Sequence, residues 1–235
     1  MLDFIGTVVL VAVIALNIGA VSNVMPLRPG TRLAVAAVAG IWTGLAAACA
    51  AAGYFANTAA PFPLIGVFVA FPLVAAAIAA ILSPAARATL LAIPMQTLVG
   101  LNIARVLGGF FLLLALVDRL GGPFPQSAGW GDVLTGLLAV PVMWLAVPIS
   151  TAANRKILLW NALGTLDLIA AVALGVVSAN GSPLQLIHAG AGSAAVQLLP
   201  WALIPTVLVP FYLITHGIVF AQLRARRIGA RRQAV

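Results

Sequence analysis

Two charged residues lie deep inside long apolar stretches of this chain, where a charge is costly. Arg105 stands in an apolar stretch from about residue 89 to 117, and Asp167 stands in another from about 157 to 177. A charge at the centre of a lipid bilayer costs from about 2.5 to more than about 10 kcal/mol, depending on the scale. Charged side chains in this position usually pair with a partner, and they often mark the path of a substrate or a proton.

The spacing of the sequence predicts that Arg105 and Asp167 lie at the same depth. Arg105 lies about 13 residues, or ~20 Å of helix, before Asp118, and Asp167 lies about 11 residues, or ~16 Å, after Lys156. Both distances end near the middle of a bilayer whose hydrocarbon core is ~30 Å thick. We therefore expect an ion pair in which the guanidinium binds the carboxylate in a two-bond fork.

Other polar side chains in apolar stretches could complete a site around this pair. They share a helix face with a member of the pair, or lie within one turn of each other in a later stretch: Asn102, Asn161, Tyr212 and His216. In such a site Arg105 would hold an anionic or polar group, and Asp167 would balance its charge. The alternative is a structural ion pair that only fixes the register of two helices, because a buried pair is weak evidence of function by itself.

Asp132 follows Gly129, Trp130 and Gly131, and it has two interpretations. It precedes an apolar stretch that begins at Val133, where aspartate is a favoured helix N-cap and meets the positive end of the helix dipole. If the glycine-containing segment instead folds inward as a loop, Asp132 becomes a second candidate partner for Arg105. The sequence leaves both interpretations open.

His216 is the one histidine in an apolar stretch. We expect, in decreasing order, a hydrogen-bonded core histidine, a proton-carrying or ligand-contacting residue, and a metal or haem ligand. The sequence contains no cluster of metal ligands, no nucleophile and base pair, no phosphate-binding loop and no carboxylate pair at catalytic spacing. We therefore expect no cofactor, and we favour a role that is not enzymatic.

Seven apolar stretches are long enough to position these residues as membrane-spanning helices, which need about 20 residues each. Their approximate ranges are 4–24, 33–55, 62–82, 89–117, 133–149, 157–177 and 196–221. The stretches are continuous and do not alternate with period two, which excludes a transmembrane β-barrel. Only 7% of the residues are charged and 63% are hydrophobic, whereas soluble domains have about 25% charged residues. The predicted fold is all-α: a single-domain, polytopic membrane protein with seven transmembrane helices.

The basic residues predict the orientation of these helices. They gather in the gaps after the first, third, fifth and seventh stretches, which places those gaps in the cytoplasm and the N-terminus outside. We expect the inner membrane of a bacterium. The organisation is then helices 1 to 3 in residues 1–87, a linking helix in 88–119, helices 5 to 7 in 128–223 and a basic cytoplasmic tail in 224–235.

The formal net charge of +8 comes largely from this tail. Its five arginines are Arg224, Arg226, Arg227, Arg231 and Arg232. We expect them to contact anionic lipid headgroups, with about 1 kcal/mol from each. The charge therefore indicates no nucleic-acid partner.

Three helices, a linking helix and three further helices resemble the topology of SWEET and PQ-loop transporters and of opsin-like proteins. Lys156, the only lysine, lies at a helix end, so no retinal Schiff base is expected. Four segments carry a second resemblance: residues 102–105 with Gly108 and Gly109, residues 129–132, residues 161–167, and Pro200, Pro205 and Pro210. This pattern, over about residues 94–223, resembles uncharacterised bacterial seven-helix membrane proteins and implies no activity.

We interpret the chain as a protein that binds or transports a small polar or anionic molecule, through a site near the middle of the bilayer on helices 4 to 7. The alternative is a non-catalytic structural or assembly subunit of a larger membrane complex. Its partners would then be other membrane proteins, and the ion pair would only hold helices together.

Overall fold

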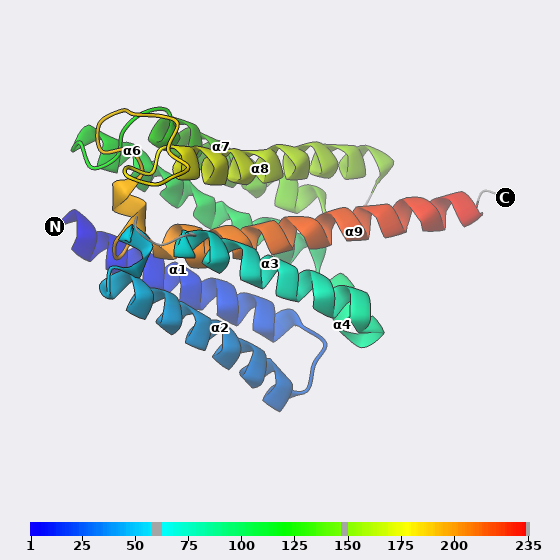
Figure 1. Cartoon of the computed structure of the whole chain (residues 1–235). Helices are drawn as coiled ribbons and strands as arrows, with labels where there is room; N and C mark the ends of the chain where they lie inside the picture. The colour runs from blue at the N-terminus through cyan, green and yellow to red at the C-terminus, as the bar shows by residue number, and fades with distance from the viewer. Residues whose placement is uncertain (58–62, 147–149, 234–235) are drawn as a thin grey trace.

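The computed structural model describes residues 1–57, 63–146 and 150–233, with side chains in the last helix up to Ile228. All regular elements in these residues are helices (Figure 1). The long ones are α1 (Leu2–Val24), α2 (Pro29–Ala51), α3 (Leu64–Leu82), α7 (Phe124–Leu145), α8 (Thr151–Val177) and α9 (Val209–Gln233). The short ones are η1 (Tyr54–Ala56), α4 (Pro84–Leu91), α5 (Met95–Leu101), η2 (Asn102–Gly108), α6 (Gly109–Leu116), η3 (Ala194–Gln197) and η4 (Ile204–Leu208).

Seven helical segments in the described residues are long and apolar enough to cross a membrane. This confirms the predicted all-α fold and the predicted number of helices. Two of the seven are composite: Met95–Leu116 joins α5, η2 and α6, and Ile204–Ile228 joins η4 to most of α9.

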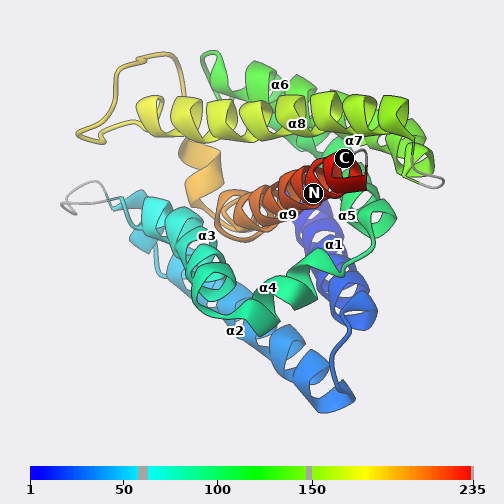
Figure 2. The same ribbon diagram turned by 90° about the vertical axis from the view of Figure 1, so that its right-hand side faces the viewer.

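The last helix, α9, runs through the middle of the bundle. In an 18-residue stretch of its span 56% of the residues are buried, compared with 11% and 6% in stretches of the same length in α2 and α3. Figure 2 shows α9 between α8 on one side and α2 and α3 on the other. The two termini lie at opposite ends of the bundle in Figure 1, and we refer to these as its amino-terminal and carboxy-terminal ends.

The helix boundaries differ from the predicted ones at two prolines. The fourth predicted stretch, 89–117, is interrupted between α4 and α5, because Pro94 has no N–H and its ring obstructs a continuous helix. The fifth was predicted to begin at Val133, but α7 begins at Phe124 with a proline in its first turn, where proline is tolerated. Asp132 therefore lies about two turns inside a helix. The prediction that it is an N-cap is wrong.

The last predicted stretch, 196–221, also begins later in the structure. Residues 194–197 form η3, and the spanning segment starts with the π-helical turn η4. The helix then continues to Gln233, so Arg224, Arg226 and Arg227 lie on its last turns. The side chains of Arg231 and Arg232, and the predicted helix ends at Phe62 and Ile149, lie outside the described residues.

The buried apolar side chains form two clusters, one toward each end of the bundle. On α8, Leu168 belongs to the amino-terminal cluster and Trp160 to the carboxy-terminal one, and polar residues lie between them. The same order holds on α7 and α9. We refer to the residues between the clusters as the polar layer: Arg105, Asp132, Thr135, Asn161, Gly164, Asp167, Thr215 and His216.

The first helix is fastened at the amino-terminal end, outside the polar layer. Oδ1 of Asp3 accepts hydrogen bonds from Nη1 of Arg119 at 2.6 Å and from Nε1 of Trp201 at 2.7 Å. The Asp3–Arg119 ion pair is partly exposed, so its contribution to stability is small.

Candidate functional site

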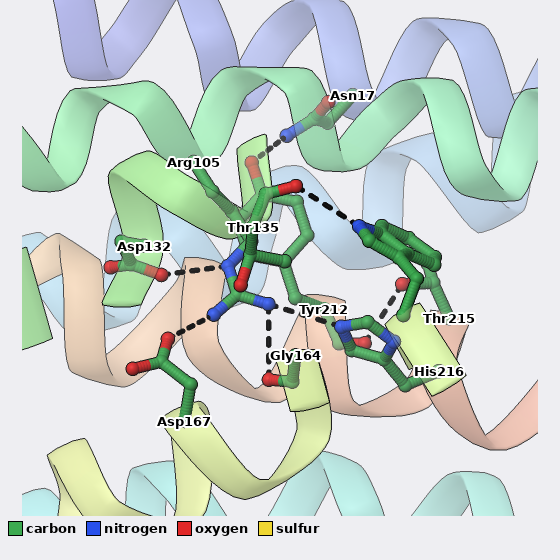
Figure 3. Close-up of polar contacts among 10 residues, drawn as sticks. Asn17, Arg105, Asp132, Thr135, Gly164, Asp167, Tyr212, Thr215 and His216 are labelled. Atoms are coloured by element: carbon green, nitrogen blue, oxygen red, sulfur yellow. Dashed lines mark hydrogen bonds and ion pairs between the residues drawn. The ribbon is translucent and has the colours of Figure 1, made fainter. Parts of the chain in front are cut away.

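Arg105 lies at the centre of the polar layer and is buried. Its Nε donates to Oδ1 of Asp132 at 2.7 Å, and its Nη2 donates to Oδ2 of Asp167 at 2.5 Å. Its Nη1 donates to the carbonyl oxygen of Gly164 and lies next to Nε2 of His216, each at 3.1 Å (Figure 3). Each nitrogen of the guanidinium is therefore engaged by the protein itself.

The expected ion pair between Arg105 and Asp167 is present, with a different geometry. It is made by Nη2 alone and not by a two-bond fork, because Nε is taken by Asp132. Asp132 is thus a second partner of Arg105. It reaches this position from within α7, which is helical through residues 129–131, and not from an inward loop.

Asn161 fixes the protonation of His216. Nδ2 of Asn161 donates to the backbone carbonyl of His216 at 3.1 Å, so Oδ1 is the acceptor that faces Nδ1 of the ring at 2.7 Å. Nδ1 therefore carries the proton, and Nε2 presents its lone pair to Arg105. An imidazolium would instead place an N–H against the N–H of the guanidinium. The ring is neutral in this arrangement.

The two carboxylates outnumber the single guanidinium. With both ionised and the histidine neutral, the cluster carries one net negative charge. The Arg105 side chain is 1% exposed, whereas those of Asp132 and Asp167 are 12% and 13% exposed. Oδ2 of Asp132 and Oδ1 of Asp167 accept no hydrogen bond from any described residue. The surplus charge thus lies on the part of the cluster that is least enclosed.

Glycines let the helices approach closely enough for these contacts. A side chain at Gly131 would overlap the carboxylate of Asp167, and one at Gly108 would overlap Asp132. Without a Cβ at these positions, α7 packs directly on α8 and on η2. The glycines thereby bring both carboxylates within hydrogen-bond distance of Arg105.

Asn102 and Tyr212 do not touch the guanidinium through a hydrogen bond. Nδ2 of Asn102 donates to the carbonyl of Leu98 at 2.9 Å, and its buried Oδ1 has no partner among the described residues. The hydroxyl of Tyr212 accepts a hydrogen bond from Nδ2 of Asn17 at 3.0 Å, which joins α9 to α1. Tyr212 also borders a cavity of about 20 Å³ beside Arg105.

Sequence reasoning missed three contributors to this cluster. Asn17 was noticeable as a polar residue in an apolar helix, but nothing in the sequence linked it to Tyr212. Thr135 and Gly164 contribute backbone carbonyls, to Trp160 and to Arg105, and a backbone group leaves no signal in residue type. The available signal for the two backbone carbonyls was the number of glycines in α7 and α8, the helices that contain Thr135 and Gly164.

A cavity of about 100 Å³ leads to the polar layer from the amino-terminal end. It lies between α3, α7, α8 and the segment around η3 and η4. Among its described lining residues Asp132 is the only charged one. Its remaining walls are mostly apolar, with Asn57, Ser182, Ser193 and Gln197 as further polar residues, so Asp132 is the charged group of a largely apolar pocket.

A second cavity, of about 540 Å³, lies among α1, α2, α3 and α9 and is almost entirely apolar. It does not include the charged residues of the polar layer. Within the part of the chain that the structure describes, no group of three or more histidine, cysteine, aspartate or glutamate residues could hold a metal ion.

Comparison with known proteins places the chain in a family. The family described as "Domain of unknown function (DUF8737)" matches residues 62–224, which is more than half of the chain, so the chain belongs to this family. The match includes every predicted site residue and extends further toward the N-terminus than the resemblance over 94–223. No curated protein and no solved structure matches the chain.

Proposed function

We propose that this member of the DUF8737 family binds a small polar molecule inside the membrane and transports it, with the polar layer as its binding site. The observation that carries the proposal is the second carboxylate beside Arg105. One carboxylate neutralises a buried guanidinium, and a second adds a charge that an apolar interior disfavours. A purely structural ion pair has no need of it, whereas a binding site does.

The carboxylates, and not the guanidinium, would face the ligand. An anionic ligand on Arg105 would have to displace Asp132 or Asp167, since all three guanidinium nitrogens already have acceptors. The side chains of Asp132 and Asp167 are less enclosed than that of Arg105, and Asp132 lines the cavity of about 100 Å³. The sequence suggested either a polar or an anionic ligand, and of these two we therefore propose the polar one.

Two irregular helical segments support movement around this site. η2, which carries Arg105, is a 3₁₀ segment between two α-helices, and η4 is a π-helical turn that leads into α9. Such interruptions are frequent at functional hinges, and discontinuous helices form the substrate sites of many transporters. The cavity gives access from the amino-terminal end, while the apolar cluster around Trp160 closes the other side. Transport would require these two barriers to open alternately.

The test compares the small molecules that the protein retains. Wild type, Asp132→Asn and Asp3→Asn would be placed in lipid nanodiscs, incubated with a cell extract, separated from it rapidly and examined by mass spectrometry. Asp3→Asn is the matched control, because Asp3 is a half-exposed carboxylate outside the polar layer. We expect the same molecule in wild type and Asp3→Asn, and at least about tenfold less in Asp132→Asn.

Two outcomes would contradict the proposal. One is equal retention by all three proteins. The other is no molecule above the level of empty nanodiscs, and stoichiometric protein partners in that case would favour the assembly subunit.

A further inference from the structure

We infer that the molecule bound at the polar layer is an organic monocation, an ammonium group on a small apolar body; this inference rests on the proposed function. The first step is the charge of the cluster. With both aspartates ionised, they contribute two negative charges against the one positive charge of Arg105, while His216 is neutral because Asn161 holds its proton on Nδ1. A ligand with one positive charge makes the buried cluster neutral.

The second step is the direction of the surplus charge. Figure 3 shows the second oxygens of Asp132 and Asp167 on the same side of the guanidinium, on the side away from His216. Neither oxygen accepts a hydrogen bond from a described residue. Asp132 lines both cavities, whereas Asp167 lines neither and its Oδ1 lies against Gly131. An ammonium group has up to three N–H donors and no acceptor, so it complements the second oxygen of Asp132.

The third step is the wall around Asp132. Phe111, Leu168 and Val209 line both the cavity of about 100 Å³ and the small cavity beside Arg105, so they flank the carboxylate. These side chains offer an apolar surface and an aromatic ring. Both suit the body of an organic cation, and the ring attracts the cationic group itself.

Size and ligand type favour an organic cation over a metal ion. At about 10–15 Å³ for each water-sized group, the cavity has room for on the order of seven to ten such groups, which is the size of a small amine. Divalent magnesium or calcium takes six or more oxygen ligands. Besides Asp132, Tyr212 is the one described residue of the small cavity with a side-chain oxygen, so a metal ion there would fall far short of six ligands.

The inference is tested with a pair of probes that differ in charge and hardly in shape, benzylammonium and benzyl alcohol. Their binding to the full-length protein in nanodiscs is measured by saturation-transfer NMR, with empty nanodiscs subtracted. We expect benzylammonium to bind wild type at least about tenfold more tightly than benzyl alcohol does, and we expect this ratio to fall to about one in Asp132→Asn.

A second variant leaves the charges in place. Val172→Phe fills the cavity from α8, so it should weaken benzylammonium but spare methylammonium; Ile169→Phe, an exposed position on the same helix, should change neither. Equal affinity of the two benzyl probes for wild type would overturn the inference, and so would the absence of saturable binding.

The two experiments distinguish a failure of the cation inference from a failure of the proposed function. A neutral or anionic molecule that co-purifies with wild type and is lost in Asp132→Asn would leave the proposed function standing and contradict the cation. Asp132-dependent benzylammonium binding, without any retained molecule in the extract experiment, would support the cation site and contradict the function.

Discussion

Arg105 is held by two carboxylates through different nitrogens, so its charge acts on α7 and α8 at once. Lysine could not replace it. The ammonium group is a single compact centre, whereas the planar guanidinium presents separate N–H groups to Asp132, to Asp167 and to the carbonyl of Gly164. The residue therefore fixes the relative position of two helices as well as the charge between them.

Removal of the Arg105 charge should lower the free energy of unfolding by more than the lost hydrogen bonds alone would, because it also leaves buried charges without a partner. Arg105→Met leaves two buried carboxylates unpaired, and we expect a loss of about 3–5 kcal/mol in the free energy of unfolding. The triple variant that adds Asp132→Asn and Asp167→Asn contains no uncompensated charge and should recover a large part of this loss. Unfolding in detergent micelles measures both values.

The partly exposed Arg119 provides the control for this series. Arg119→Met removes an ion pair at the amino-terminal end and should change stability by less than about 1 kcal/mol. A triple variant as unstable as Arg105→Met alone would show that shape, and not charge, is what the cluster needs.

At the scale of the elements, the sequence predicted that the helices of Arg105 and Asp167 meet, but it did not predict where α7 begins. Depth counting along two helices placed Arg105 and Asp167 at one level, because the rise per residue of a helix is constant. The start of α7 could not be found in this way. Its first turns contain Gln126, Ser127 and two glycines, which are typical of a loop, but in the structure they are helical, and all of them except Gln126 are at least partly buried.

The close approach of α7 and α8 predicts that alanine destabilises the protein at Gly131 on α7 but not at Gly217 on α9. Gly131→Ala places a methyl group against the carboxylate of Asp167, and we expect it to destabilise the protein by about 1–3 kcal/mol. Gly217→Ala on α9 meets no atom within 4 Å and should be neutral or stabilising by up to about 1 kcal/mol. Thermal unfolding of the two variants in parallel checks the signs. A Gly131→Ala protein as stable as wild type would mean that the two helices are not held this closely.

At the scale of the whole molecule, the basic gaps predicted from the sequence gather at one end. The connection after α1, the start of α4, the start of α8 and the end of α9 all lie at the carboxy-terminal end of the bundle (Figure 1). Arg119 lies at the other end, paired with Asp3. This arrangement agrees with the rule that basic residues stay in the cytoplasm, and the orientation remains a prediction.

Reporter fusions at the C-terminus test that orientation. We expect a fused green fluorescent protein to fluoresce in a bacterial host and a fused alkaline phosphatase to be inactive, since the phosphatase is active only outside the cytoplasm. The same fusions after the first helix, within the first connection, should give the same result. An active phosphatase at the C-terminus would reverse the orientation and place the cavity that leads to Asp132 on the cytoplasmic side.

The position of the polar layer between two apolar clusters also has an electrical consequence. A full elementary charge that crosses a membrane gains or loses about 2.3 kcal/mol for each 100 mV of potential. A cation that stops at the layer traverses only part of this voltage drop, so its affinity should vary with membrane potential by a fraction of that amount. The sign of the variation would report the side from which the cation enters.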